Sequence, residues 1–108
     1  MLLQFIKNLF DGGGNVHLEA ALAQKPLLLD VRSQSEFATG SVAGAVNIPL
    51  QNLPGRLKEI RGQKHIVVFC RSGNRSGMAK TVLDKNGFAN VTNGGSWQNV
   101  NQIFNNKK

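Results

Sequence analysis

Residues 65–80 read HIVVFCRSGNRSGMAK and predict a strand, a tight polar loop and a helix in direct succession. The apolar run His65–Phe69 is short and continuous, which is typical of a strand covered on both faces. Cys70, the only cysteine of the chain, follows that run directly. The polar loop Cys70–Arg75 then leads into a predicted helix that begins at Arg75. A thiol is therefore expected at a strand-to-helix turn.

A cysteine at such a turn is expected to be reactive, because the thiolate is the nucleophilic form of cysteine and the turn stabilises it. Backbone N–H groups of the loop and the positive end of the helix dipole both stabilise a thiolate. Arg71 and Arg75 add positive charge within the same loop. Gly73 is expected to turn the backbone so that its N–H faces inward. The sequence thus predicts that Cys70 has a lowered pKa and is the nucleophile.

Strand and helix patterns alternate along the rest of the chain. Further strands are predicted at residues 27–31, 45–48 and 91–92, and helices at 16–23, 34–40, 53–60, 75–87 and after Ser96. This alternation on short connections predicts an α/β fold, with a mainly parallel central sheet of about five short strands and helices on both faces. Ligands of such sheets bind at the carboxyl ends of the strands, which is where Cys70 lies.

Local signals set several of the predicted boundaries. Ser33 and Glu36 form the pattern of a capping box at the start of a helix. Gly87 followed by Phe88 predicts a Schellman-type end of the helix after the loop, and Gly94–Gly95 predicts a turn. The glycine-rich segment 11–15 predicts a hinge. We therefore expect a short helix and hinge at 1–15, one domain at 16–104 and a flexible tail at 105–108.

Composition excludes several classes of protein. A chain of 108 residues is long enough for one hydrophobic core. The net charge of +7 comes from dispersed basic residues without interleaved aromatic residues, which favours a solvated basic surface over a nucleic-acid site. No stretch reaches the roughly 20 apolar residues of a membrane span. A single cysteine excludes an internal disulfide and suits a reducing compartment, so a cytoplasmic location is expected.

Cofactor and metal sites are not expected either. His17 and His65 show no ligand spacing and have no cysteine, aspartate or glutamate cluster beside them. Asp30 ends its predicted strand at the same edge of the sheet as Cys70, where it is expected to form a structural ion pair or to orient Arg32. Asp30 and Arg32 are therefore predicted to support the site. The apolar opening residues 1–10 leave a monomer or a weak homodimer open.

Several ordered segments resemble the rhodanese family of sulfurtransferases, in its small single-domain form. The resemblance covers roughly residues 16–104 and implies an α/β domain whose cysteine takes a sulfane sulfur from a donor, holds it as a persulfide and passes it to a nucleophile. It implies that Cys70 is the nucleophile and that the rest of the loop binds the sulfur. The matching segments are LDVR at 29–32, EF at 36–37, GSV at 40–42, GA at 44–45, NIP at 47–49, the loop with Cys70, Arg71, Ser72, Gly73, Asn74 and Arg75, GF at 87–88, GG at 94–95 and Trp97.

Some details of this resemblance refine the expectation. Many members have histidine where this chain has Ser41, which we interpret as a change in packing around the site. Ser72 is expected either to donate to the sulfur or to cap the helix, and Asn74 is more typical of a turn than of a ligand. Two cations, Arg71 and Arg75, favour a doubly charged donor such as thiosulfate, with cyanide or a thiol as acceptor.

Two alternatives stay open. The first is a non-catalytic or sulfur-delivery module that acts through a protein partner, although such non-catalytic modules commonly lack the cysteine. The second is a cysteine phosphatase or arsenate reductase, which needs an arginine six positions after the cysteine to surround a tetrahedral oxyanion. Here that position is Ser76, and Arg75 comes one residue early. A shorter loop suits a single sulfur atom better than a phosphate.

Overall fold

A four-stranded parallel sheet forms the centre of the computed structural model, which describes residues 13–106. Neighbouring strands pair in parallel throughout, in the order β2-β1-β3-β4. The α/β fold with a parallel sheet is confirmed, with four strands in the described part where about five were expected. The opening helix predicted at 1–10 lies outside the described residues. The strands are β1 (Leu27–Asp30), β2 (Val46–Asn47), β3 (Ile66–Cys70) and β4 (Val91–Ser96).

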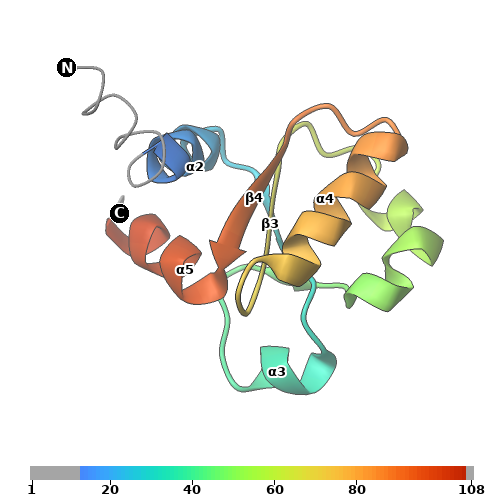
Figure 1. Ribbon diagram of the computed structural model, residues 1–108, viewed down its shortest axis with the longest axis horizontal. Coiled ribbons are helices and arrows are strands. Elements are labelled where there is room, and N and C mark those ends of the chain that lie inside the picture. Colours follow the sequence, from blue (N-terminus) through green and yellow to red (C-terminus); the bar gives the residue numbers. More distant parts are fainter. Residues whose placement is uncertain (1–12, 107–108) are drawn as a thin grey trace.

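Helices cover both faces of the sheet, as Figure 1 shows. One face carries α2 (Gly13–Ala23) and α5 (Trp97–Asn106), and the other carries α4 (Asn74–Lys85). The short helix α3 (Gln34–Ala38) lies beyond the carboxyl end of β4 (Figure 1). Within residues 13–106 no helix combines the length and the apolar character needed to cross a membrane.

Strand β3 is buried on both faces because its side chains alternate between two cores. Val67 and Phe69 pack among the residues under α2 and α5. Val68 and Cys70 pack in the cluster beneath α4. All five residues of β3 are buried, so the continuous apolar run predicted from the sequence is confirmed as a central parallel strand. Cys70 is its last residue, at the carboxyl end of the sheet.

The predicted caps are present. The Ser33 side chain accepts from the Glu36 amide, and the Glu36 side chain accepts from the Ser33 amide, which completes the capping box. At the end of α4, the Phe88 amide donates to the Leu83 carbonyl and the Gly87 amide to Asp84, which is the Schellman pattern. These local signals depend on residues close in sequence, which is why the sequence predicts them correctly.

Two predicted elements are wrong in detail. The helix predicted at 53–60 consists of two 3₁₀ segments, η2 (Leu50–Gly55) and η3 (Leu57–Glu59), because Pro54 has no N–H for an α-helical bond. The turn predicted at Gly94–Gly95 is part of β4, where the register shifts opposite Val68 and Phe69. Glycine permits this irregularity because the backbone there approaches its neighbours closely.

Helix starts also differ slightly from the sequence expectation. The first described helix, α2, begins at Gly13 rather than Val16, so part of the predicted hinge is helical. Helix α4 begins at Asn74, directly after Gly73, rather than at Arg75. The final helix α5 begins right after Ser96, whose hydroxyl accepts from the Asn99 amide as a helix cap.

Candidate active site

The Cys70 sulfur is enclosed by the backbone of the loop that follows it. The Gly73 amide donates to Sγ at 3.0 Å, and the Ser76 amide lies 3.4 Å from the same atom. Gly73 has a φ of +103°, a conformation that side chains resist, and this turns its N–H toward the sulfur as the sequence predicts. The Cys70 side chain is buried. We call residues 70–76 the active-site loop.

Ser76 is a site residue that sequence reasoning missed. Its hydroxyl oxygen lies 3.4 Å from Cys70 Sγ and donates to Asn93 Oδ1 at 2.7 Å. The hydroxyl accepts from the neutral thiol, and its hydrogen can rotate to donate to the sulfur once the thiolate forms. Asn93 also accepts from the Gly95 amide at 2.9 Å. In the sequence, Ser76 serves only to distinguish this loop from that of a phosphatase. The contact to Asn93 joins the loop to β4 and has no local sequence signal.

Hydrogen bonds hold the pKa of the Cys70 thiol below its usual value. Burial raises this pKa, but the Ser76 hydroxyl and the amides of Ser76, Gly73 and Ser72 together lower it by more. The sequence also predicts a lowered pKa for Cys70, so the direction of this shift agrees with the prediction. The causes that lower this pKa are hydrogen bonds, whereas the sequence prediction also relied on the two arginines of the loop.

Arg75 does not lie free beside the sulfur, because Glu36 of α3 holds it. Two parallel bonds join them, from Nη1 to Oε1 at 2.7 Å and from Nη2 to Oε2 at 2.9 Å. The bonds from Arg75, followed by that from the Ser33 amide, hold the pKa of Glu36 well below its usual range. Bonding to Glu36 raises the pKa of Arg75, and the Cys70 thiolate adds to that rise. The Arg75 donors are therefore engaged by Glu36, whose carboxylate offsets the charge of Arg75.

Asp30 and Arg32 form a buried ion pair at the carboxyl end of β1. Arg32 Nη2 lies 2.7 Å from Asp30 Oδ2 and also donates to the Gly40 carbonyl at 2.6 Å. Its guanidinium lies over the Trp97 ring, 5.2 Å from the centroid. The Ser41 hydroxyl completes the group by donating to Asp30 Oδ2 at 2.7 Å. The predicted ion pair is present, and it fixes the chain on either side of α3.

A cavity of about 270 Å³ opens beside the active-site loop. Arg71 on its wall is exposed and makes no hydrogen bond or ion pair with any other residue of 13–106. The other charged side chains on the wall have partners, Arg32 with Asp30 and Glu36 with Arg75. The cavity is therefore positive overall. Its lining residues are Arg32, Glu36, Thr39, Arg71, Trp97 and Gln98.

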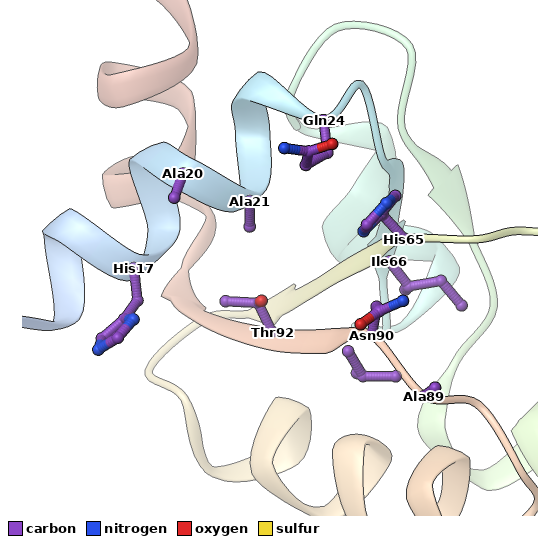
Figure 2. Close-up of a pocket in the computed structure, with 10 residues that line it drawn as sticks. His17, Ala20, Ala21, Gln24, His65, Ile66, Ala89, Asn90 and Thr92 are labelled. Atoms are coloured by element: carbon purple, nitrogen blue, oxygen red, sulfur yellow. The ribbon is translucent and has the colours of Figure 1, made fainter.

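A larger cavity, of about 500 Å³, lies at the opposite edge of the sheet. Figure 2 shows His17 on α2 and His65 just before β3 among the side chains around it. Asn90 and Thr92 line it from the amino end of β4, so this cavity is remote from Cys70. Among residues 13–106 no three histidine, cysteine, aspartate or glutamate side chains gather as they would around a metal ion. The smaller cavity is the one that Arg71 of the active-site loop lines, whereas the larger one contains no residue of that loop.

Residues 15–102 match the sequence model of the rhodanese-like domain. The chain belongs to the rhodanese family. Among related rhodanese-family sequences, a sulfurtransferase of Allochromatium vinosum is 37% identical over 62% of this chain and 63% of its own length. A thiosulfate sulfurtransferase of Escherichia coli is 32% identical over 67% of this chain and 71% of its own. The family resemblance read from the sequence is thereby confirmed.

Solved structures agree with this rhodanese fold. A rhodanese of Escherichia coli, solved with anions, has a TM-score of 0.63 at 32% identity and covers 68% of this chain and 88% of its own. A human single-domain sulfurtransferase has a TM-score of 0.61 at 25% identity, over 84% and 91% of the two chains. The fold is a single rhodanese-like α/β domain.

In some relatives this chain matches only part of a longer protein. An uncharacterised protein of Bacillus subtilis is 43% identical over 65% of this chain but only 56% of its own length. An adenylyltransferase and sulfurtransferase of Saccharomyces cerevisiae is 32% identical over 86% of this chain and 24% of its own. The rhodanese-like domain therefore occurs both alone and within larger proteins among these relatives.

Proposed function

We propose that the protein is a thiosulfate sulfurtransferase that carries sulfur as a persulfide on Cys70. The observation that carries this proposal is the set of hydrogen bonds to the sulfur, led by the Gly73 amide at 3.0 Å. These donors favour a negative sulfur atom both before and after it has taken up a second sulfur. The positive cavity beside the loop supports an anionic donor.

The first step forms a persulfide. The Cys70 thiolate attacks the outer sulfur of thiosulfate, a new S–S bond forms, and the S–S bond of thiosulfate breaks. Sulfite leaves with the bonding electron pair, so the two negative charges of the donor depart on sulfite and the thiolate charge moves to the terminal persulfide sulfur. The same amides that bound the thiolate lie near this new charge.

The second step regenerates the thiolate. Cyanide or a thiolate attacks the terminal sulfur of the persulfide, and the electron pair of the breaking S–S bond returns to Cys70. Cyanide leaves as thiocyanate and a thiol leaves as a new persulfide. No metal or organic cofactor is required, because each step exchanges one sulfur between two nucleophiles.

The residues of the loop take different roles in this proposal. Arg71 attracts the anionic donor, because it is exposed and unpaired within the described part of the chain. Gly73 and Ser72 supply amides to the sulfur, and Ser76 adds its hydroxyl and amide. Asn74 is exposed at the first position of α4 and serves the turn. Asp30 and Arg32 support the loop edge through their buried pair.

A second candidate function is delivery of sulfur to a protein. The observation that favours it is the match to a larger adenylyltransferase and sulfurtransferase, in which the rhodanese-like region is one part. The same persulfide on Cys70 would form, and its terminal sulfur would pass to a thiolate of a partner protein, with the electron pair of the breaking S–S bond returning to Cys70. A cysteine phosphatase is disfavoured, because Ser76 occupies the place of the arginine that such a loop needs.

The proposal also includes a cytoplasmic location and a monomer or weak homodimer as the state of assembly. A single cysteine without an internal disulfide suits a reducing compartment, so we place the activity in the cytoplasm. The transfer uses residues of one chain, which fits a monomer or a weak homodimer. Size-exclusion chromatography with light scattering would measure the assembly, and a stable dimer would contradict this part.

Intact-mass analysis before and after thiosulfate tests the proposal. The expected result is a gain of one sulfur atom in the wild type, lost again on adding cyanide with release of thiocyanate. Because Cys70 is the only cysteine, Cys70→Ser should show neither the gain nor the turnover. No adduct in the folded wild type, or turnover by the serine variant, would contradict the mechanism. Turnover of an aryl phosphate that depends on Cys70 would favour the phosphatase instead.

A further inference from the structure

The two arginines of the active-site loop are not equivalent. Arg75 forms two bonds to Glu36, whereas Arg71 makes no hydrogen bond or ion pair within the described residues 13–106. The remaining charges of the site cancel, since Arg32 is paired with Asp30. Among the described residues around the cavity, an incoming donor therefore meets one uncompensated cation, Arg71, although the loop contains two arginines.

We propose that Glu36 is the residue that sets the charge of the donor that this site prefers. By neutralising Arg75, Glu36 leaves Arg71 as the unpaired positive charge of the site within residues 13–106. This assignment rests on the proposed sulfurtransferase function and adds to it a specificity-determining residue outside the active-site loop. Glu36 lines the cavity beside the loop, so its charge lies next to the path of the donor.

The proposal follows from how charge acts on donors of different charge. A dianion gains twice as much as a monoanion from each additional positive charge at a given distance. The sulfite released in the first step is also doubly charged, so an additional cation would hold it as well. A neutral Arg75–Glu36 pair weakens the attraction for thiosulfate and eases the departure of sulfite.

Glu36 also has a structural role, which the test must separate from its charge. Its Oε1 accepts from the Ser33 amide at 3.0 Å in the capping box of α3. Glu36→Gln removes the negative charge and keeps an oxygen that accepts from this amide. Ser33→Ala is the matched control, because it removes the hydroxyl of the cap and leaves both Glu36 and Arg75 charged.

Two donors of the same shape measure the preference for charge. Thiosulfate carries two negative charges, and methanethiosulfonate, in which a methyl group replaces one oxygen, carries one. Both transfer their outer sulfur to a thiolate, with sulfite leaving from the first and methanesulfinate from the second. The ratio of kcat/KM for thiosulfate to kcat/KM for methanethiosulfonate, taken at low salt, reports the charge of the site and cancels losses common to both.

A four-member cycle of wild type, Glu36→Gln, Arg75→Gln and the double variant gives the decisive result. Glu36→Gln is expected to raise the ratio about fivefold through a lower KM for thiosulfate, and Arg75→Gln to lower it about as much. The double variant should return the ratio to within about twofold of the wild type, since both states of the pair are neutral. Added salt should shrink all of these differences.

Other results would overturn the assignment. A double variant with the low ratio of Arg75→Gln would mean that Arg75 contacts the donor directly. A ratio unchanged in Glu36→Gln, or changed equally by Ser33→Ala, would mean that Glu36 acts only through α3. If neither donor adds sulfur to Cys70 in the wild type, the proposed function itself fails. If both donors add sulfur to Cys70 but the ratio of their kcat/KM values is the same in all four proteins, the proposed function stands and only the role of Glu36 is overturned.

Discussion

The amide of Gly73 donates to the Cys70 sulfur at 3.0 Å from a backbone whose φ is +103°. Gly73 lies three positions after Cys70, so the loop must reverse within one turn, and a positive φ achieves this. A Cβ added at Gly73 would lie 3.6 Å from Gly95 Cα, which is an ordinary contact. Glycine is therefore required by the dihedral angle and not by lack of space. The sulfur-binding geometry exists before any donor arrives.

Gly73→Ala should impair sulfur transfer far more than folding. The strained dihedral costs about 1–2 kcal/mol of stability, whereas loss of an aligned amide donor slows persulfide formation about 100-fold. Stopped-flow loading with thiosulfate and thermal unfolding measure the two effects. Gly87→Ala is the matched control, since its φ is +89° at the far end of α4 and it should lose similar stability with normal transfer. Equal transfer rates in the two variants would contradict a role for the Gly73 amide.

The lowered pKa of Cys70 predicts that its reactivity persists below the pH range of an ordinary thiol. Burial raises the pKa, and the hydrogen bonds from Ser76, Gly73 and Ser72 outweigh it. Alkylation by iodoacetamide should therefore have a midpoint below the value of about 8.5 for free cysteine, and should fall only as the pH drops through that lower midpoint. Ser76→Ala should move the midpoint upward.

The unfolded protein supplies the control for this titration. In concentrated urea the hydrogen bonds to the sulfur are lost, so the alkylation midpoint of Cys70 should return to about 8.5. A native midpoint equal to or above the unfolded one would contradict the balance of burial and hydrogen bonding described for this thiol.

Asp30→Asn should be strongly destabilising. The Asp30 side chain is fully buried and accepts from Arg32 and Ser41, so a neutral amide would leave the buried Arg32 charge uncompensated. Breaking a buried ion pair in this way costs about 3–5 kcal/mol. Urea unfolding measures the loss. Glu59→Gln, which breaks an exposed pair with Arg56, should leave the unfolding midpoint unchanged, and an equally small effect at Asp30 would contradict the argument.

The sequence predicts most of what depends on neighbouring residues. The strand–loop–helix around Cys70, the capping box at Ser33 and the inward amide of Gly73 each follow from residues within about one turn of each other. The pairing of Arg75 with Glu36 joins positions 39 apart in the chain. It depends on where α3 lies over the loop, which the packing of the whole domain determines. Two arginines near a thiol therefore indicate two free cations, whereas within residues 13–106 the structure leaves Arg71 unpaired and pairs Arg75 with Glu36.

The Gly94–Gly95 pair shows the same limit in the fold itself. Two glycines after a short apolar run are typical of a turn, and the sequence carries no sign that a helix packs against them. In the structure β4 continues through both residues to Ser96, with its irregular register at this point. Gly94 is buried, so its lack of a side chain serves close packing between β4, β3 and α5 rather than a reversal of the chain.

Gly94→Ala should therefore destabilise the fold through steric overlap. A Cβ at Gly94 would lie 2.5 Å from Val100 Cγ2 and 3.1 Å from Val67 Cγ1, both within buried side chains. Overpacking of this kind costs about 1–3 kcal/mol, measured by urea unfolding. Gly62→Ala, where an added Cβ meets nothing within 4 Å, should have no such effect. Combining Gly94→Ala with Val100→Ala should cost less than the sum of the two single losses, because the overlap disappears; strictly additive losses would contradict this contact.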